Sequence, residues 1–529
     1  AAAGATALLP VTSEAAAGSD APVDFEAVVD FDLEEATVAG LLRDMARGKR
    51  TAQSITRAYL ERIEALNRRG PQLRAVIETN PEAMAIAARL DAERKSGRVR
   101  GALHGIPVLL KDNVDTADRM TTTAGSYALE GSIAARDSFI AERLRAAGAI
   151  LLGKTNLSEW ANFRSNHSSS GWSGRGGQAR NPYVLDRSPC GSSSGSGSSV
   201  SANLCAVAVG TETDGSIVCP SAANGVVGIK PTLGLVSRAG IIPIAHSQDT
   251  AGPMARTVTD AALLLTAMAG VDPRDSATAA GRTRASSDYT RFLDANALTG
   301  ARIGVAREKF FGYSGDADRL VEEALAEMKR RGAIIVDPAN IPTAAKFDDS
   351  EFEVLLYEFK ADLNAYLAAL GPRARVKSLA DIIAFNERDK ARELAWFGQE
   401  TMIQAEAKGP LTSKGYRDAL AKNLRMSRSE GIDAVMDKHR LDAIVAPTGS
   451  PAWPIDLING DHFTGASSTP AAVAGYPNIN VPAGFVHGLP VGISFFGRAW
   501  SEPKLIGIAY AFEQATRHRQ SPRFLPTLE

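Results

Sequence analysis

One lysine stands where it could serve as a base for nucleophilic chemistry. Lys111 follows the apolar run GIPVLL, so its amine is expected to emerge at the end of a strand. If Lys111 is buried, desolvation lowers its pKa and makes a neutral amine available as a general base near neutral pH. The alternative is an ordinary lysine whose charged end reaches solvent.

Serines crowd the first of two loops that could supply a nucleophile. Residues 188–201, SPCGSSSGSGSSVS, include eight serines in fourteen residues, a composition typical of flexible linkers. Sequence containing Trp160, Phe163 and Trp172 precedes this stretch, and the apolar run LCAVAV follows it closely. Because a linker should separate domains, we expect these serines to belong to the folded domain instead.

The second serine loop follows an expected strand at residues 205–209. In GTETDGSIVCP, Ser216 comes directly after Gly215, where successive backbone N–H groups can converge on one oxygen. A neutral lysine, serine hydroxyls and converging backbone donors are the groups that cleavage of an acyl bond by a serine requires. The sequence therefore favours Lys111 and the two serine loops as partners in catalysis.

A phosphate-loop pattern also occurs, in the wrong structural order. Residues 148–155, GAILLGKT, match G-x4-G-K-[ST], which needs a strand, then a loop whose amides face phosphate, then a helix. Here a helical stretch comes first, Gly148 ends it, and the middle residues are themselves the strand. We interpret the match as accidental, and failure to bind ATP would exclude it.

A nucleophile-elbow pattern, G-x-S-x-G, occurs at residues 191–195 with Ser193 at its centre. An elbow needs an apolar strand that runs directly into the serine. The preceding NPYVLDRSPC contains two prolines and no strand pattern, so Ser193 is not expected to be the nucleophile.

The other reactive residue types add no motif. None of the seven histidines stands in a setting that marks it as a base, and H-E-x-x-H and C-x-x-C are absent. We therefore expect no metal and no cofactor. The three cysteines give no disulfide framework, and Cys190 and Cys219 are expected to be buried, unreactive thiols.

Composition and charge exclude several classes of protein. Of 529 residues, 44% are hydrophobic and 22% charged, which excludes disorder, collagen and coiled coils. Lys and Arg number 59 against 60 Asp and Glu, so the net charge is −1 and no basic field attracts nucleic acid. No apolar run reaches the ~20 residues of a membrane helix. We expect a soluble protein that binds neither nucleic acid nor membrane.

The elements that position these groups are short apolar strands alternating with helices. Helical periodicity runs from residue 33 to about 95. Later runs are apolar on both faces, which favours an α/β fold with a large mixed, mostly parallel twisted sheet covered by helices on both faces. The expected strands are residues 106–110, 150–152, 205–209, 303–306, 334–336, 443–446, 479–481 and 491–496.

We divide the chain into three parts. Residues 1–24 form a flexible or processed segment, 25–100 a helical extension, and 101–529 a single catalytic domain with a helical insertion at 347–440. The small residues of the first part are typical of a remnant of signal cleavage or of an arbitrary boundary, so export and a cytoplasmic location both stay open. The oligomeric state is open too, with a monomer favoured.

Four motifs, in the same order, resemble those of the amidase signature family. CGSSSGS at 190–196 is similar to the family's G-G-S-S-G-G-S, and GTETDGSIV at 210–218 is similar to its G-T-D-x-G-G-S-I-R. The strand ending in Lys111 and GVVGIKPT at 225–232 match as well. The resemblance covers most of the chain and implies the family's fold and a serine amidohydrolase.

The resemblance also implies roles for single residues. The family's nucleophile maps to Ser216, its bridging serine after a cis peptide bond to Ser192, and its lysine to Lys111. Lys111 would take a proton from Ser192, which takes one from Ser216, while Ser193 supports the hydrogen bonds. The oxyanion hole would consist of four backbone N–H groups, those of Thr213, Asp214, Gly215 and Ser216.

Three positions depart from the family's pattern. Glu212 and Val218 replace the usual Asp and Arg together, so the usual carboxylate-guanidinium pair cannot form. Asp214 stands where a second glycine is common, and an anion there would oppose an oxyanion unless its side chain points away.

These departures, with residues 156–165, 170–183 and 247–256, are similar to the bacterial peptide amidase branch, which removes ammonia from the carboxyl-terminal amide of peptides. The resemblance thus implies a peptide or small-molecule amide as substrate and an acyl-enzyme intermediate. Two alternatives stay open: a broad aliphatic or aryl amidase with the same triad, and an amidotransferase subunit that passes ammonia to aminoacyl-tRNA, which the neutral charge weighs against.

Overall fold

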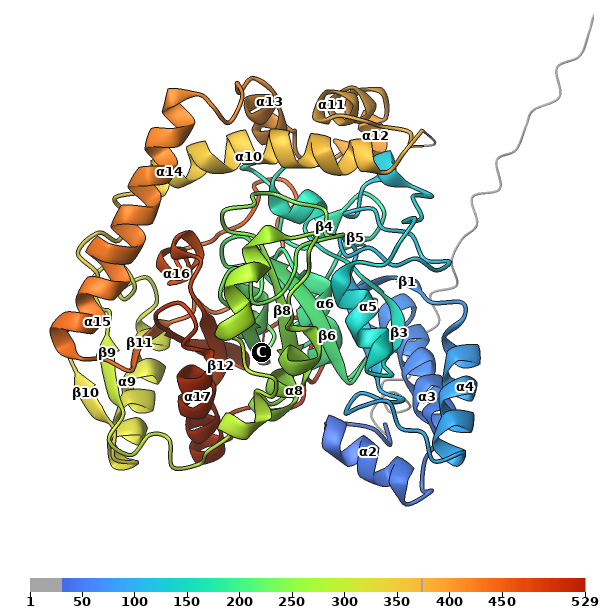
Figure 1. Cartoon of the computed structure of the whole chain (residues 1–529), viewed down its shortest axis with the longest axis horizontal. Coiled ribbons are helices and arrows are strands. Elements are labelled where there is room, and N and C mark those ends of the chain that lie inside the picture. Colours follow the sequence, from blue (N-terminus) through green and yellow to red (C-terminus); the bar gives the residue numbers. More distant parts are fainter. Residues whose placement is uncertain (1–30, 373, 529) are drawn as a thin grey trace, which may run out of the picture.

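The computed structural model describes residues 31–372 and 374–528, so the expected segment 1–24 lies outside the described residues. Within them, eleven strands form one sheet with helices packed around it (Figure 1). From edge to edge, the strands are β1 (Val76–Thr79), β3 (Ile150–Thr155), β2 (Pro107–Lys111), β6 (Val207–Glu212), β8 (Thr250–Ala255), β7 (Val227–Lys230), β12 (Asn478–Val486), β13 (Leu489–Phe496), β11 (Ala443–Pro447), β9 (Arg302–Val305) and β10 (Ile334–Val336).

The expected α/β fold with a large mixed sheet is confirmed, but parallel strands do not predominate in it. Parallel pairing joins β2 to β3 and β6, and β9 to β10 and β11, whereas the other six neighbouring pairs are antiparallel. Three of these six pairs involve β7 or β8, which were not among the expected strands and lack a continuous apolar run. Gly252 and Pro253 in β8 are uncommon in a central strand, so its pattern gives little signal.

All eight expected strands are present. Two of them, β12 and β13, form a hairpin. His487 and Gly488 close this hairpin, and both have positive φ, at 47° and 78°. A two-residue turn with positive φ at both positions matches the right-handed twist of the flanking strands.

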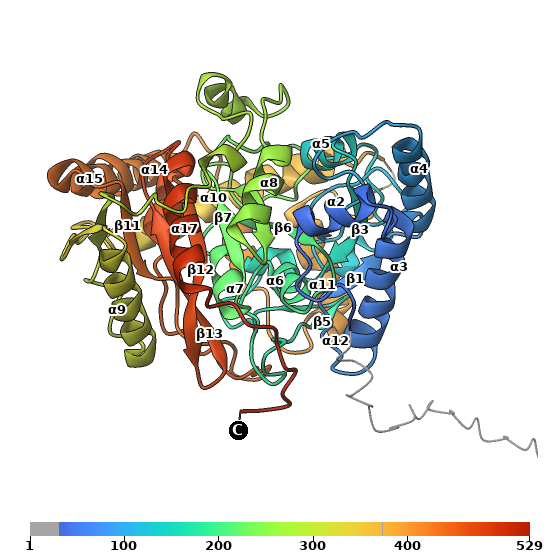
Figure 2. The same ribbon diagram turned by 90° about the horizontal axis from the view of Figure 1, so that it is seen from below.

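The helical pattern expected for residues 33–95 is confirmed in part, because the strand β1 interrupts it. Thr51 is the N-cap of α3 (Ala52–Ile63). It forms a capping box with Ser54, in which each side chain accepts the other residue's backbone N–H group. Ile55, Tyr59 and Ile63 face the core and are fully buried. In both views the helices α2 to α4 lie at the β1 end of the sheet, and α9 (Gly315–Arg330) lies at the opposite end (Figures 1 and 2). They are α2 (Val38–Ala46), α3 (Ala52–Ile63) and α4 (Ala83–Lys95).

Residues 347–440 are largely helical, as expected. The longest helix of this segment, α10 (Asp348–Ala369), buries Phe359, Leu363 and Leu367 in one apolar cluster with Ile244 and Phe163. Among the helices that the structure describes, none is both long enough and apolar enough to cross a bilayer. The helices of the segment are α10 (Asp348–Ala369), α11 (Leu379–Arg388), α12 (Lys390–Glu393), α13 (Glu400–Glu406), α14 (Lys414–Ser427) and α15 (Asp433–His439).

The phosphate-loop pattern is built into the sheet. Gly148, with φ of 84°, follows α5 (Phe139–Ala146), and the residues after it form β3. Lys154 is fully buried, and its ammonium donates to the Val114 carbonyl and to Thr122 Oγ1. Because the amides of β3 take part in the sheet, this segment has no loop to hold a phosphate.

Candidate active site

Lys111 ends β2 inside the protein, as predicted for a candidate base. Its side chain is fully buried, and Nζ donates to Ser192 Oγ at 2.8 Å and to Thr211 Oγ1 at 2.9 Å. Burial lowers the pKa of Lys111 to about 7, although the negative charges of Asp249 and Glu212 oppose this shift. At neutral pH a large fraction of this amine is therefore uncharged and able to accept a proton.

Ser192 links Lys111 to Ser216. A cis peptide bond joins Gly191 to Ser192, and Ser192 Oγ donates to Ser216 Oγ at 2.9 Å. Both serines are buried, and each hydroxyl can donate and accept, so a proton can pass in either direction along the chain of three side chains. The structure thus brings together the three residues that the sequence singled out.

Ser193 lies beside this chain and braces the end of β6. Its Oγ donates to the Thr211 carbonyl at 2.9 Å and accepts the Thr211 N–H at 3.1 Å. The backbone N–H of Ser193 also donates to the Ser216 carbonyl at 3.2 Å. With its hydroxyl occupied in this way, Ser193 has a supporting position and not that of a nucleophile.

The serine-rich stretch forms a buried helix, α6 (Ser194–Ser201), and no linker. A Cβ on Gly195 would lie 2.1 Å from the Ala75 carbonyl oxygen, so only glycine fits there. Ser196 Oγ contacts Thr155 Oγ1 at 2.7 Å and donates to the Val209 carbonyl at 3.1 Å. Small side chains allow α6 to pack this closely, and the hydroxyls of Ser194, Ser196 and Ser198 donate to nearby carbonyls.

Residues 213–216 form a tight loop between β6 and α7 (Val218–Ala223). Gly215 has φ of 78°, a conformation that glycine adopts without strain. Across the part of the chain that the structure describes, the hydrogen bonds use none of the four backbone N–H groups of this loop as donors. These N–H groups next to Ser216 are therefore free to bind a developing negative charge.

The Asp214 side chain is turned toward α16 (Thr469–Ala474). Its Oδ2 accepts a hydrogen bond from Thr469 Oγ1 at 2.7 Å. Burial raises the pKa of Asp214, and burial together with the charge of Asp214 raises the pKa of Glu351 well above its ordinary value. The Asp214 carboxyl is thus engaged by a hydroxyl of α16, and its burial disfavours the charged form relative to an exposed aspartate.

Glu212 binds backbone donors at the start of the next helix. Its Oε2 accepts the backbone N–H groups of Ile217 at 2.7 Å and Val218 at 3.0 Å. These groups lie at the start of α7, where helix N–H donors have no partner within the helix. The Glu212 carboxylate thus has backbone partners, although position 218 carries no guanidinium.

Cys190 and Cys219 form a disulfide, which corrects the expectation of two unreactive thiols. Their Cα atoms lie 6.0 Å apart, and the bond ties the loop of Ser192 to α7, which follows Ser216. Cys205 is buried and free. An odd cysteine count and a separation of 29 residues gave no sign of this pairing.

A cavity of about 530 Å³ opens onto Ser192 and Ser216. Phe163, Leu355 and Trp453 form apolar parts of its wall, and Leu355 belongs to α10. Through Leu355 the helical segment 347–440 borders this cavity. The cavity is large enough for a ligand much bigger than a simple amide.

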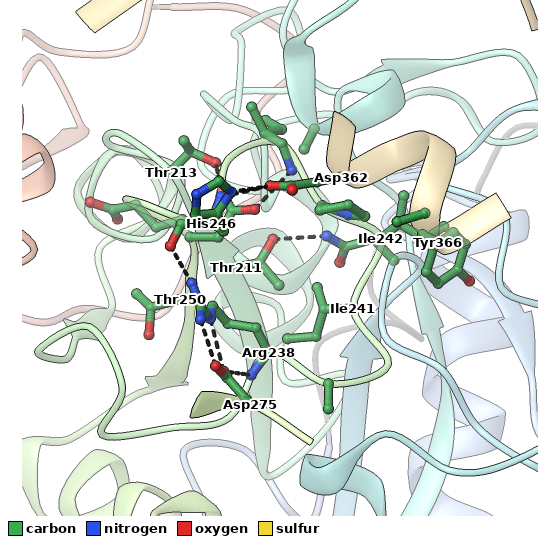
Figure 3. Close-up of a pocket in the computed structure, with 18 of the residues that line it drawn as sticks. Thr211, Thr213, Arg238, Ile241, Ile242, His246, Thr250, Asp275, Asp362 and Tyr366 are labelled. Carbon is green, nitrogen blue, oxygen red and sulfur yellow. Dashed lines mark hydrogen bonds and ion pairs between the residues drawn. The ribbon is translucent and has the colours of Figure 1, made fainter. Parts of the chain in front are cut away.

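A second cavity, of about 400 Å³, lies behind the loop, and Thr213 and Ile244 line both cavities. Figure 3 shows Arg238 paired with Asp275 and His246 paired with Asp362 at its wall. Glu358 lies close enough to His246 and Asp362 for the three to share a cation. Both ring nitrogens of His246 already face carboxylates, which raise its pKa and suit a protonated imidazole.

Sequence reasoning missed three groups that hold the site together. Thr211 receives the Lys111 ammonium, Glu212 binds the start of α7, and Asp249 accepts a hydrogen bond from Thr213 Oγ1 at 2.6 Å. Thr211 and Glu212 lie within the motif 210–218, and Asp249 lies in the stretch 247–256. The sequence motifs thus include all three residues, but they do not indicate which groups these residues contact.

Known proteins resemble this chain over nearly its whole length. A family model described as Amidase matches residues 54–506. The crystal structure of a peptide amidase from Stenotrophomonas maltophilia is 54% identical, with a TM-score of 0.90, and the match covers 94% of this chain and 100% of that one. A probable amidase of Arabidopsis thaliana is 45% identical, covering 94% of this chain and 93% of that protein. A glutamyl-tRNA(Gln) amidotransferase subunit of Ralstonia pickettii is 36% identical, covering 92% and 99%.

Proposed function

The chain belongs to the amidase signature family and is an amide-hydrolysing enzyme, and on this premise we propose that Ser216, Ser192 and Lys111 are its catalytic triad. The observation that carries the proposal is the chain of hydrogen bonds from Lys111 Nζ through Ser192 Oγ to Ser216 Oγ, at 2.8 Å and 2.9 Å. A buried amine with a pKa of about 7 supports the role of Lys111 as the base.

The reaction begins when neutral Lys111 takes a proton from Ser192 as Ser192 takes the proton of Ser216. The Ser216 oxygen attacks the amide carbonyl and forms a tetrahedral oxyanion. As the carbon-nitrogen bond breaks, Ser192 gives its proton to the leaving nitrogen and regains one from Lys111, so ammonia departs. Water, activated through the same relay, then hydrolyses the acyl-enzyme and yields a carboxylate.

The oxyanion is held by the backbone N–H groups of residues 213–216, with Gly215 allowing the loop to turn tightly. Their freedom from other hydrogen bonds among the described residues supports this role. Single donors of this kind contribute about 3 kcal/mol to transition-state binding in other serine hydrolases.

The substrate is the carboxyl-terminal amide of a peptide. The likeness to a peptide amidase over nearly the whole chain supports this choice. So does the cavity of about 530 Å³, because its wall, with Phe163, Leu355 and Trp453, offers contacts for peptide side chains beyond the reacting amide.

An ammonia-release assay tests the proposal with the purified full chain. Amidated dipeptides should be hydrolysed with a kcat/KM well above that for a simple aliphatic or aryl amide, and Ser216→Ala should abolish the release. Equal rates on both kinds of amide would instead indicate a broad amidase with the same triad. Release by the Ser216→Ala variant at the wild-type rate would refute the triad.

A further inference from the structure

The loop of Ser216 is held from behind by the turn at residues 244–249. Asp249 Oδ1 accepts the Thr213 hydroxyl at 2.6 Å, and Gln248 Nε2 donates to the Thr213 carbonyl at 3.3 Å. Thr213 is thus bound through both its side chain and its backbone by two consecutive residues. Neither contact involves a residue of the triad.

The turn itself is fixed firmly. Asp249 Oδ2 accepts the N–H groups of Ile244 at 2.8 Å and Ala245 at 2.9 Å, so one carboxylate closes the turn and binds Thr213. The turn is also attached to α10, because the His246 N–H donates to Asp362 Oδ2 at 2.9 Å and the Ser247 N–H donates to Glu358 Oε2 at 2.9 Å.

The loop borders open space at Thr213. Thr213 and Ile244 line two cavities, of about 530 Å³ and about 400 Å³. Figure 3 shows Thr213 and His246 at the wall of the second cavity. Where the loop borders these cavities, the polar contacts of Asp249 and Gln248 restrain its backbone.

We infer that Asp249 is a positioning residue for the reaction proposed above: it fixes Thr213, and through it the backbone donors that bind the oxyanion. An amidase needs these donors at a set distance from the oxyanion, and a displacement of about 1 Å lowers the rate about 100-fold in other enzymes. The inference rests on the proposed function, because the donors matter only if Ser216 attacks a carbonyl.

The charge of Asp249 acts on the base as well. Asp249 and Glu212 are the carboxylates whose negative charges oppose the fall in the pKa of Lys111 caused by burial. Burial raises the pKa of Asp249 itself to about 6, and the groups facing it are Thr213, the carboxylate of Asp362 on α10 and the paired Arg238. Loss of this charge should therefore lower the pKa of Lys111 further.

Four variants separate positioning from charge. Thr213→Val removes the hydroxyl and keeps the carboxylate, and Thr213→Ser keeps both. Asp249→Asn removes the charge. It also leaves a single amide oxygen to accept from both the Thr213 hydroxyl and the backbone N–H groups of the turn. Asp260→Asn is the matched control, because Asp260 is also buried, has a pKa raised by burial to about 6 and accepts a backbone N–H, that of Val38, outside the site.

The experiment measures kcat, KM and the pH profile of ammonia release from an amidated dipeptide, with thermal unfolding of each variant. We expect Thr213→Val to lower kcat about 10-fold with little change in KM, and Thr213→Ser to restore it. Asp249→Asn should lower kcat at least as much and shift the acid limb of kcat to lower pH, whereas Asp260→Asn should leave that limb in place.

Unchanged kcat in folded Thr213→Val and Asp249→Asn would overturn the inference, while loss of activity in Ser216→Ala alone would leave the proposed function standing. A fall in kcat that merely follows the unfolded fraction at assay temperature, with no shift of the pH limb, would also overturn it. A wild-type chain that releases no ammonia would overturn the proposed function and this inference together.

Discussion

Cys190 is joined to Cys219 by a disulfide that holds the loop of Ser192 against the helix that follows Ser216. Each cysteine lies within three residues of one of the two serines. The covalent bond therefore limits how far the two hydroxyls can separate when the cavity beside them fills and empties.

Removal of this disulfide should lower both stability and activity. The double variant Cys190→Ala/Cys219→Ala should lose about 3 kcal/mol of unfolding free energy, since the bond closes a loop of moderate length. Its kcat should fall because the Ser192–Ser216 distance is no longer restrained. Thermal unfolding and ammonia release, each with and without a dithiol reductant, measure both effects. Reductant should affect the wild type and leave the double variant unchanged; an equal response of the two would contradict the prediction.

Replacement of Ser216 or Lys111 by alanine should lower kcat by roughly 10⁴-fold or more, because each removes one end of the proton relay. His518→Gln is a suitable control, since His518 lies outside both cavities described for the site and should leave most of the activity. Initial rates of ammonia release with equal amounts of folded protein provide the comparison. Appreciable turnover by either alanine variant would be incompatible with the triad.

The pH profile should show an acid limb near pH 7. Burial lowers the pKa of Lys111 to about 7, and only the neutral amine accepts a proton, so kcat/KM should rise as pH increases through this value and then level off. Measurement of kcat/KM between about pH 5 and 9 tests this. A limb centred near the ordinary lysine value, or a rate independent of pH across the range, would argue against a buried neutral amine.

Glu212→Ala should destabilise the start of α7. It leaves the N–H groups of Ile217 and Val218 without their acceptor, which should cost about 1–3 kcal/mol of unfolding free energy. Glu212→Gln is the control, because its amide oxygen can still accept both. Thermal unfolding should separate the two variants, and equal melting temperatures would show that the cap contributes little.

Local patterns predicted those parts of the fold whose cause is local. Apolar runs marked all eight expected strands, and the stripe of Ile55, Tyr59 and Ile63 marked α3. The strand β8 was missed because Gly252 and Pro253 interrupt its pattern, and it is held by pairing with neighbours on both sides. Tertiary pairing overrode sequence preference there.

In the site, too, the sequence predicted the features that depend on adjacent residues and missed those that depend on distant ones. The place of Lys111 at a strand end and of Ser216 after a glycine turn follows from adjacent residues, and the resemblance of motifs added Ser192. The contact of Asp249 with Thr213 spans 36 residues, and the disulfide spans 29. Such contacts depend on how distant segments pack, which no local spacing encodes.

The close packing of α6 has a practical consequence for anyone who maps this enzyme by random substitution. Gly195 and Ser196 should tolerate almost no larger residue, because carbonyl oxygens and hydroxyls fill the space around them. A saturation library would thus report the whole serine-rich stretch as indispensable, although we assign only Ser192 to the reaction. Intolerance to bulk and participation in chemistry would look alike in such a map, and only kinetics on folded variants would tell them apart.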